Sequence, residues 1–274
     1  MSGELPYPEM AAVLADGRHR LIRSLMAASA GALVLGLAFS YGGAFDLHRY
    51  AEAVPTILQL TSDALPPDFA RWRQWGRPLL DTLTMSLAGT ALGALAALPL
   101  GAMAARTVTR HPGLGGAARL ALSLLRSVPC LIWGVIFVAA VGFGPLPGIL
   151  ALATHSTGML GKFFAETLEH VEPGPGDALR SQGVSRLGVL RFSVLPQILP
   201  RLVDVTAYRW EHNVRAATTL GLVGAGGLGL EIITAFHLFE YREASALILV
   251  LLGLVSAINL LGAHARGRFL GHKA

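Results

Sequence analysis

The chain has 274 residues, of which 53% are hydrophobic and only 14% are charged, and its mean hydropathy is +0.55. A soluble domain usually carries about 25% charged residues, so a soluble enzyme is not expected. The net charge of +5 raises the question of nucleic acid. However, the charges lie in clusters between long apolar runs, which indicates a membrane protein with the lipid bilayer, and no nucleic acid, as its partner.

Metal and disulfide chemistry are not expected either. The single cysteine, Cys130, can form neither an intrachain disulfide nor a thiolate metal site. The nine histidines contain no H-x-x-x-H or H-E-x-x-H pair, so the sequence predicts no metal site and no zinc enzyme.

Several apolar runs have the length of a transmembrane helix, because a bilayer core about 30 Å thick needs roughly 20 helical residues. The candidates cover residues 24–43, 79–104, 120–142, 146–165, 198–222 and 243–263, the fifth being interrupted by charged residues. The segment before the first span carries Glu4, Glu9 and Asp16, which favours an uncleaved anchor over a signal peptide. The sequence thus predicts an all-α membrane protein, a multi-pass bundle of about six transmembrane helices within residues 24–265.

The distribution of Lys and Arg predicts that both termini are cytoplasmic, because basic residues concentrate in cytoplasmic loops. With this orientation most of the 22 basic residues lie inside. The expected layout has a cytoplasmic N-terminal segment at 1–23, a periplasmic or interfacial segment at 44–78, a cytoplasmic loop at 166–197 and a cytoplasmic tail at 266–274. The outer segment is expected to be a loop with an interfacial stretch around its two tryptophans.

The second span contains Gly89-x-x-x-Gly93. In lipid this spacing lets two helix backbones approach closely. Two interpretations stay open, a helix-packing seam and the ordinary enrichment of small residues in membrane helices.

The loop between the fourth and fifth spans reads "EPGPGDALRSQGVSRLGVLRFSVLPQILPRL". The Pro-Gly run at 173–176 is expected to break the preceding helix, with Asp177 as the N-cap of a short helix over 178–187 and a turn near Gly188. Pro196 and Pro200 are expected to redirect the chain into the fifth span.

This loop resembles the cytoplasmic loop of ABC importer permeases, which has the pattern E-A-A-x3-G-x9-I-x-L-P. The spacing matches throughout, whereas three identities differ: Asp for Glu, Leu for the second Ala and Ser for Ile. In the family the loop docks in a groove of the ATPase subunit. The resemblance therefore implies an ATPase-coupling role for Asp177, Ala178, Gly183, Leu195 and Pro196.

Ionisable side chains in the fifth span pose a question of function, because each charged residue at a helix centre costs roughly 2.5–3.5 kcal/mol on an insertion scale. Helical spacing predicts a polar stripe of Asp204, Tyr208, Glu211 and Arg215, with Glu211 paired to Arg215. Arg209 and Asn213 are expected on nearly the opposite side. Tyr208, Arg209, Glu211, Asn213 and Arg215 are thus candidates for a translocation path, and a structural ion pair is the alternative.

A glycine run follows, and Gly224, Gly226 and Gly229 match the dinucleotide fingerprint G-x-G-x-x-G. That site needs alternating strands and helices, whereas the sequence predicts helices throughout. Together with Gly227, these glycines are expected to form a non-helical turn that leaves the membrane near its outer face.

Three longer stretches closely resemble the permease subunit of phosphonate ABC importers, the PhnE type. They are "TLTMSLAGTALGALAALPLGAMAAR" (82–106), "RSVPCLIWGVIFVAAVGFGPLPGILALATHSTGMLGKFFAE" (126–166) and "SVLPQILPRLVDVTAYRWEHNVRAATTLGLVGAGGLG" (193–229). The resemblance covers about residues 64–265. It implies the MetI-like architecture of type I importers in a bacterial inner membrane.

The resemblance also implies partners: a second permease copy or a paralogue, an ABC ATPase dimer inside and a periplasmic phosphonate-binding protein outside. The chain has no G-x-x-x-x-G-K-[ST] loop, so it is not expected to be an enzyme, and ATP and Mg would bind the partner ATPase rather than this chain. Phosphonate is the expected substrate. The alternatives are a same-architecture permease for phosphite, a phosphate-like anion or methionine, and a membrane-embedded nucleotide-binding enzyme.

Overall fold

A computed structural model describes residues 7–270 of the chain. The predicted cytoplasmic ends, 1–23 and 266–274, therefore lie partly outside the described residues, and Lys273 lies outside them altogether. By their internal contacts the residues form two compact units, 1–62 and 63–274.

The first unit consists of two helices. Helix α1 (Tyr7–Tyr41) contains an apolar stretch, His19–Tyr41, that is long enough to cross a membrane. Helix α2 (Leu47–Asp63) occupies residues that were expected to form a loop. The expectation was wrong because Val54, Ile57 and Leu58 follow the i, i+3, i+4 spacing of an amphipathic helix, which lies naturally at a membrane interface.

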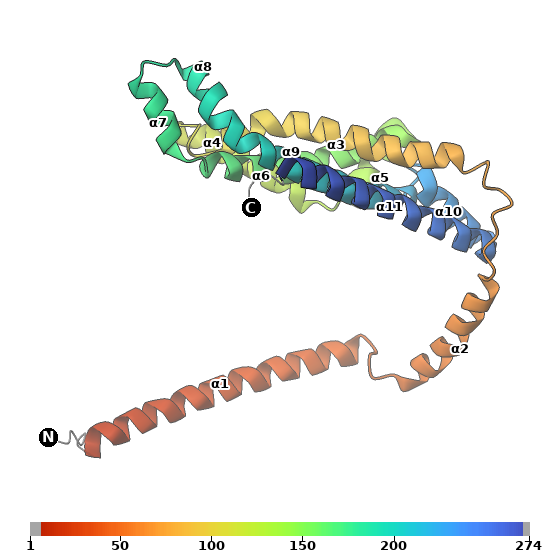
Figure 1. The fold of residues 1–274 in the computed structure, drawn as a ribbon. Helices are drawn as coiled ribbons and strands as arrows, with labels where there is room; N and C mark the ends of the chain where they lie inside the picture. The colour runs from red at the N-terminus through yellow and green to blue at the C-terminus, as the bar shows by residue number, and fades with distance from the viewer. Residues whose placement is uncertain (1–6, 271–274) are drawn as a thin grey trace. The chain divides into compact units, whose positions relative to one another are not determined.

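The second unit contains the remaining helices (Figure 1). They are α3 (Gly76–Ala104), α4 (Pro112–Ser127), α5 (Cys130–Val141), α6 (Pro145–Glu169), α7 (Pro173–Ser181), α8 (Arg186–Val189), a π-helical turn (Leu190–Val194), α9 (Leu195–Gly221), α10 (Gly227–His237) and α11 (Tyr241–Leu270). No strand occurs in residues 7–270. The all-helical prediction is confirmed, and the βαβ unit of a dinucleotide site is missing from this range.

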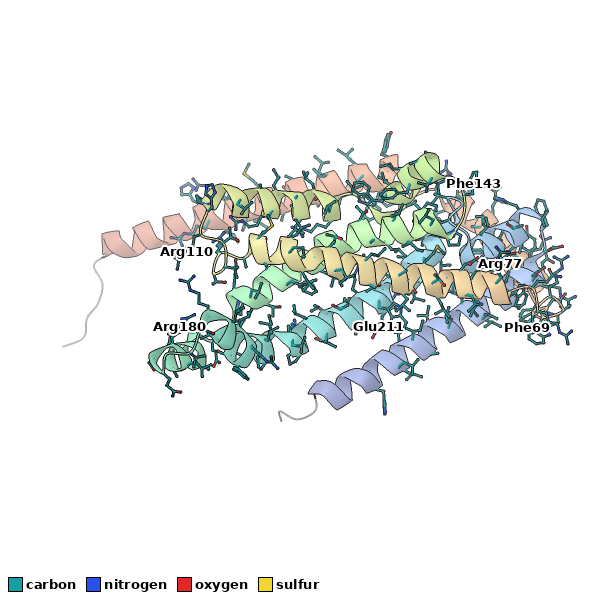
Figure 2. All side chains as sticks on the ribbon, turned by 90° about the horizontal axis from the view of Figure 1, so that it is seen from above. Phe69, Arg77, Arg110, Phe143, Arg180 and Glu211 are labelled. Carbon is teal, nitrogen blue, oxygen red and sulfur yellow. The ribbon has the colours of Figure 1, made fainter. Side chains whose placement is uncertain are left out.

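The loops of this unit lie at two opposite ends. Figure 2 shows Arg110 and Arg180 at one end and Arg77 and Phe143 at the other. Arg110 and Arg180 belong to segments predicted to be cytoplasmic, and Arg77 belongs to a segment predicted to be periplasmic. We call the first end the basic end and the second the glycine-turn end, after the glycines of residues 221–229.

Among the described residues three helices are long and apolar enough to cross a membrane, including 76–104 and 241–264, and a fourth span results if α4 and α5 count together. The predicted span 120–142 is broken, since α4 and α5 meet at 88°. The break follows from Pro129, which disfavours helical geometry at Val128, whose ψ is 123°. Helices α6 and α9 match the predicted spans 146–165 and 198–222 in position, but neither is among these candidate spans.

The two glycines of the second span form a packing seam between α3 and α6. A Cβ atom added at Gly89 would lie 2.6 Å from Cβ of Leu152, and one at Gly93 would lie 2.7 Å from Cβ of Ser156. Both distances are too short for any larger residue. The interpretation of Gly89-x-x-x-Gly93 as a seam is therefore the one that the fold supports.

Helix α7 differs from its predicted position. It begins at Pro173, where a missing N–H costs nothing because the first turn of a helix has no acceptor for it. Asp177 therefore lies inside α7 rather than at its N-cap, and the turn comes at Gly183 rather than Gly188. The Ser185 hydroxyl accepts a hydrogen bond from the Gly188 N–H and starts α8. The chain then enters α9 through the π-helical turn, and Pro196 and Pro200 are both part of α9.

Candidate functional site

Helix α9 carries the candidate site, and one of its faces is bound into the bundle. Arg209 is only 5% exposed. Its Nε donates to the Ser156 hydroxyl at 3.0 Å, and its Nη2 lies 2.6 Å from Nδ1 of His155. Both partners are on α6, so the Arg209 guanidinium ties α9 to α6.

Asn213 extends this buried network by one turn. Its side chain is fully buried, and its Nδ2 donates to the hydroxyls of Thr90 and Ser156, each at 2.8 Å. Thr90 belongs to α3. The network therefore links α3, α6 and α9 through the uncharged partners of Arg209 and Asn213, and it holds the orientation of α9.

The opposite face of α9 is exposed and polar. Tyr208 is 61% exposed, and Arg215 and His212 are also exposed, whereas Glu211 is buried. The predicted pairing of Glu211 with Arg215 is not found among the described residues. One helical turn of 3.6 residues after Tyr208 falls between positions 211 and 212, so spacing alone does not decide which of the two shares its face. In the fold His212 is exposed and Glu211 is buried. We define the α9 stripe as Tyr208, His212, Arg215 and Thr219.

A groove of about 380 Å³ extends the α9 stripe toward the basic end. It is lined by Phe163, Arg201, Asp204, Val205 and Tyr208. Arg201 and Asp204 form an ion pair at 3.1 Å. Asp204 therefore lies on the same side of α9 as Tyr208. The groove leads from this side toward the basic end.

We expect Arg209→Lys to lower the thermal stability of the protein. Lysine keeps the charge but cannot span Ser156 and His155 at once, because the two bonds use two nitrogens of a planar guanidinium. Interhelical hydrogen bonds in membrane proteins contribute about 0.6 kcal/mol on average, so a drop of roughly 1–2 kcal/mol in unfolding free energy is expected. A thermal melt in detergent measures it, and an unchanged midpoint would contradict the anchoring role of Arg209.

The predicted ATPase-coupling residues lie at the basic end. Asp177 pairs with Arg180 at 2.6 Å within α7. Gly183 adopts φ +78°, a left-handed conformation that other residues rarely adopt. Leu195 and Pro196 begin α9 after the π-helical turn. The fold thus brings Asp177, Ala178 and Gly183 onto one helix-turn unit, while Leu195 and Pro196 lie at the foot of α9.

The glycine run forms the turn between α9 and α10. Gly224, Gly226 and Gly227 have φ of +89°, +86° and +73°. The Gly144 N–H donates to the Gly224 carbonyl at 3.1 Å, and the Leu228 N–H donates to the Thr82 hydroxyl at 2.9 Å. Gly229 lies in α10, where it packs directly on the backbone of α9. The turn is therefore fastened to the α5–α6 loop and to α3.

Sequence reasoning missed several residues of this region. His155, Ser156 and Thr90 hold Arg209 and Asn213, and His212 belongs to the α9 stripe. A small polar residue in an apolar helix gives no sign of which neighbour it faces. Only the adjacency of His155 and Ser156 in the fourth span was a usable signal.

A multi-helix membrane bundle with a polar helix face and a basic helix-turn unit at one end is the arrangement expected of a transport permease. Residues 97–267 match the family of the binding-protein-dependent transport system inner membrane component. This match covers more than half of the chain, and the chain belongs to this family.

Known proteins agree with this assignment. The chain is 47% identical over 241 residues to the phosphite transport system permease protein PtxC of Stutzerimonas stutzeri, covering 87% of this chain and 88% of that one. It is 39% identical over 205 residues to the phosphate-import permease protein PhnE of Mycolicibacterium smegmatis, covering 75% of this chain but 38% of that one.

The fold resembles a permease of known structure. The inward-facing MetNI methionine ABC transporter matches with a TM-score of 0.62 and 22% sequence identity, covering 71% of this chain and 95% of that one. At this identity the match supports the fold alone. The predicted MetI-like architecture is confirmed.

Proposed function

We propose that this chain is the membrane-spanning subunit of an ATP-driven importer for a phosphorus oxyanion and forms its translocation path. Phosphonate is the substrate that we expect, and phosphite or a phosphate-like anion is the alternative. Methionine is a weaker alternative, since a probable D-methionine permease is 26% identical to this chain over 210 residues, against 47% over 241 residues for the phosphite permease. The observation that carries the proposal is the exposed Arg215 on the α9 stripe.

The exposed polar face of α9 is costly to place against lipid. An arginine facing lipid near the centre of a helix costs roughly 2.5–3.5 kcal/mol on an insertion scale, and His212 and Tyr208 add further polar groups to the same face. This face must therefore border protein or water. A second permease copy, giving a homodimer, or a paralogue would cover it, with a water-filled path for the anion between the two subunits.

The basic end is proposed as the ATPase docking surface. Leu187 is 77% exposed and Phe192 is 68% exposed, although both are large and apolar. Such residues next to a rigid helix-turn unit are typical of a protein interface. ATP and Mg would be bound by an ABC ATPase dimer there, so this chain would have no catalytic site and no cofactor of its own.

The proposed function includes a membrane location and orientation for the chain. The chain would lie in a bacterial inner membrane with both termini in the cytoplasm, and the glycine-turn end would face a periplasmic substrate-binding protein. Growth on methylphosphonate as the sole phosphorus source tests the proposal, in a strain that carries the chain with its ATPase and binding protein. Growth should require all three. Equal growth without this chain would overturn the proposal.

We expect Gly183→Val to uncouple ATP hydrolysis from uptake. A side chain at φ +78° strains the backbone by roughly 1–2 kcal/mol, which would shift α7 relative to α8 even though no atom lies within 4 Å of the added Cβ. ATPase stimulation by loaded binding protein should fall more than basal ATPase activity does.

The control for this variant is Gly174→Val, since Gly174 also has no atom within 4 Å of an added Cβ but has no positive φ. It should stay coupled. Normal coupling in Gly183→Val would remove the docking role of this turn.

A further inference from the structure

A second polar site lies at the basic end, away from the α9 stripe. A cavity of about 340 Å³ opens between the end of α3, the second half of α4 and the end of α6. Its lining contains four basic and two acidic side chains: Arg106, Arg119, Arg126, Lys162, Glu166 and Glu169. We call it the α4 cavity.

The acidic side chains of the α4 cavity are already engaged. Glu166 pairs with Lys162 at 3.4 Å, and Glu169 accepts a hydrogen bond from the backbone N–H of Arg106 at 2.8 Å. Arg119 donates to the Ala104 carbonyl at 2.8 Å. The guanidinium groups of Arg106 and Arg126 make no ion pair among the described residues. The cavity therefore has an excess of positive charge with donors to spare.

The cavity is held rigidly by close helix packing. A Cβ atom added at Gly158 of α6 would lie 2.7 Å from the Arg126 nitrogen and 2.9 Å from the Leu122 carbonyl oxygen. Only glycine permits this approach, and it fixes the backbone of Arg126 beside α6. Leu122, Ala104 and Ala165 form a buried apolar floor. The basic groups are thus presented at the rim of an apolar pocket.

The surroundings indicate which anion fits. Leu120 and Leu124 lie one turn apart on α4 and are exposed, so the helix that supplies Arg119 and Arg126 also offers apolar surface to lipid. Basic pockets between membrane helices near the cytoplasmic face bind phosphoryl headgroups, and arginine forks match phosphate oxygens. Another cavity at the same end, lined by Glu166, Glu172 and Arg201 among others, has no such excess of positive charge.

We propose that the α4 cavity binds a phosphoryl group, supplied by the headgroup of an anionic phospholipid of the inner leaflet. Arg126 and Arg106 would hold the phosphoryl oxygens while the acyl chains extend into the bilayer beside α4. A free phosphorus oxyanion shares the headgroup chemistry and would use the same arginines. This site is independent of the transported substrate and of the α9 stripe.

The experiment compares thermal unfolding of the purified full-length chain in neutral detergent with added phosphatidylglycerol, phosphatidylcholine or inorganic phosphate. Phosphatidylglycerol at saturating concentration should raise the midpoint by about 5 °C, and phosphatidylcholine should not. Arg126→Gln should weaken the apparent affinity for phosphatidylglycerol about tenfold. Arg110→Gln should leave it unchanged, because Arg110 lies at the same end but outside the cavity lining.

Other outcomes would distinguish a lipid headgroup from a free anion as the ligand, or would overturn the proposal. A rise with inorganic phosphate alone, lost in Arg126→Gln, would keep the phosphoryl site but assign it to a free anion. Equal stabilisation by both lipids, or equal affinity in the wild type and Arg126→Gln, would overturn the proposal. Arg106→Gln provides a second test if Arg126→Gln does not fold, since the Arg106 side chain is exposed beyond the end of α3.

Discussion

Gly229→Ala should prevent the chain from reaching its folded state in useful yield. At this position α10 lies against α9 backbone to backbone, and an added Cβ would lie 2.8 Å from the carbonyl carbon of Thr218 and closer still to its oxygen. Gly221 faces the same crossing from α9, where an added Cβ would lie 2.6 Å from the carbonyl carbon of Gly229. Neither helix has a flexible side chain there that could move aside.

The added methyl group must therefore separate α9 from α10. Such overpacking costs about 3 kcal/mol, and it would also strain the turn at Gly224–Gly227 and the hydrogen bond from Leu228 to Thr82. The yield of monodisperse protein and the thermal midpoint in detergent measure the effect.

Gly253→Ala is the matched control for this variant. Gly253 is also a helical glycine, in α11, but no atom lies within 4 Å of an added Cβ. Alanine there should leave stability unchanged or raise it by up to about 1 kcal/mol. If both variants melt like the wild type, the backbones of α9 and α10 do not pack as closely as described.

Arg215→Ala should abolish phosphonate-supported growth while the protein still assembles with its ATPase. Assembly should survive because the Arg215 side chain is exposed and, within the part of the chain that the structure describes, makes no hydrogen bond or ion pair to a neighbouring helix. Transport should fail because the anion would lose a cation in its path. A hydrogen bond to a charged group contributes about 1.5–3 kcal/mol, so uptake should fall by about 10- to 100-fold.

Two measurements make this prediction specific. Arg215→Lys keeps the charge and should retain part of the uptake, which a purely structural role of the guanidinium fork would not explain. Co-purification with the ATPase subunit checks assembly in both variants. Uptake at the normal rate in Arg215→Ala would remove Arg215 from the translocation path.

The helical architecture follows from hydropathy, but its breaks and bends depend on single residues. The apolar run 79–104 predicted α3 almost to its ends, since α3 covers Gly76–Ala104. The run 120–142 is equally apolar and yet divides at Pro129 into α4 and α5. Hydropathy is averaged over a window and therefore hardly changes with one proline. The backbone, in contrast, is interrupted by a single proline.

The candidate site shows a similar limit. Spacing along α9 correctly separated Arg209 and Asn213 from Tyr208 and Arg215, because one helix is periodic. It placed Glu211 in one polar stripe with Tyr208 and Arg215, whereas Glu211 is buried and His212 is exposed beside them. It gave no partner for Arg209, because His155 lies 54 residues away in the sequence and the rotation of α6 is set by packing at Gly89 and Gly93.

The proposed function requires this chain to carry a phosphorus oxyanion across the membrane with energy from ATP. Uptake of labelled methylphosphonate, phosphite, phosphate and methionine by proteoliposomes that contain the chain with its ATPase and binding protein tests this requirement. We expect ATP-dependent accumulation of at least one phosphorus oxyanion, methylphosphonate first, and none of methionine. Accumulation of methionine alone, or of an oxyanion equally with and without ATP, would overturn the proposed function.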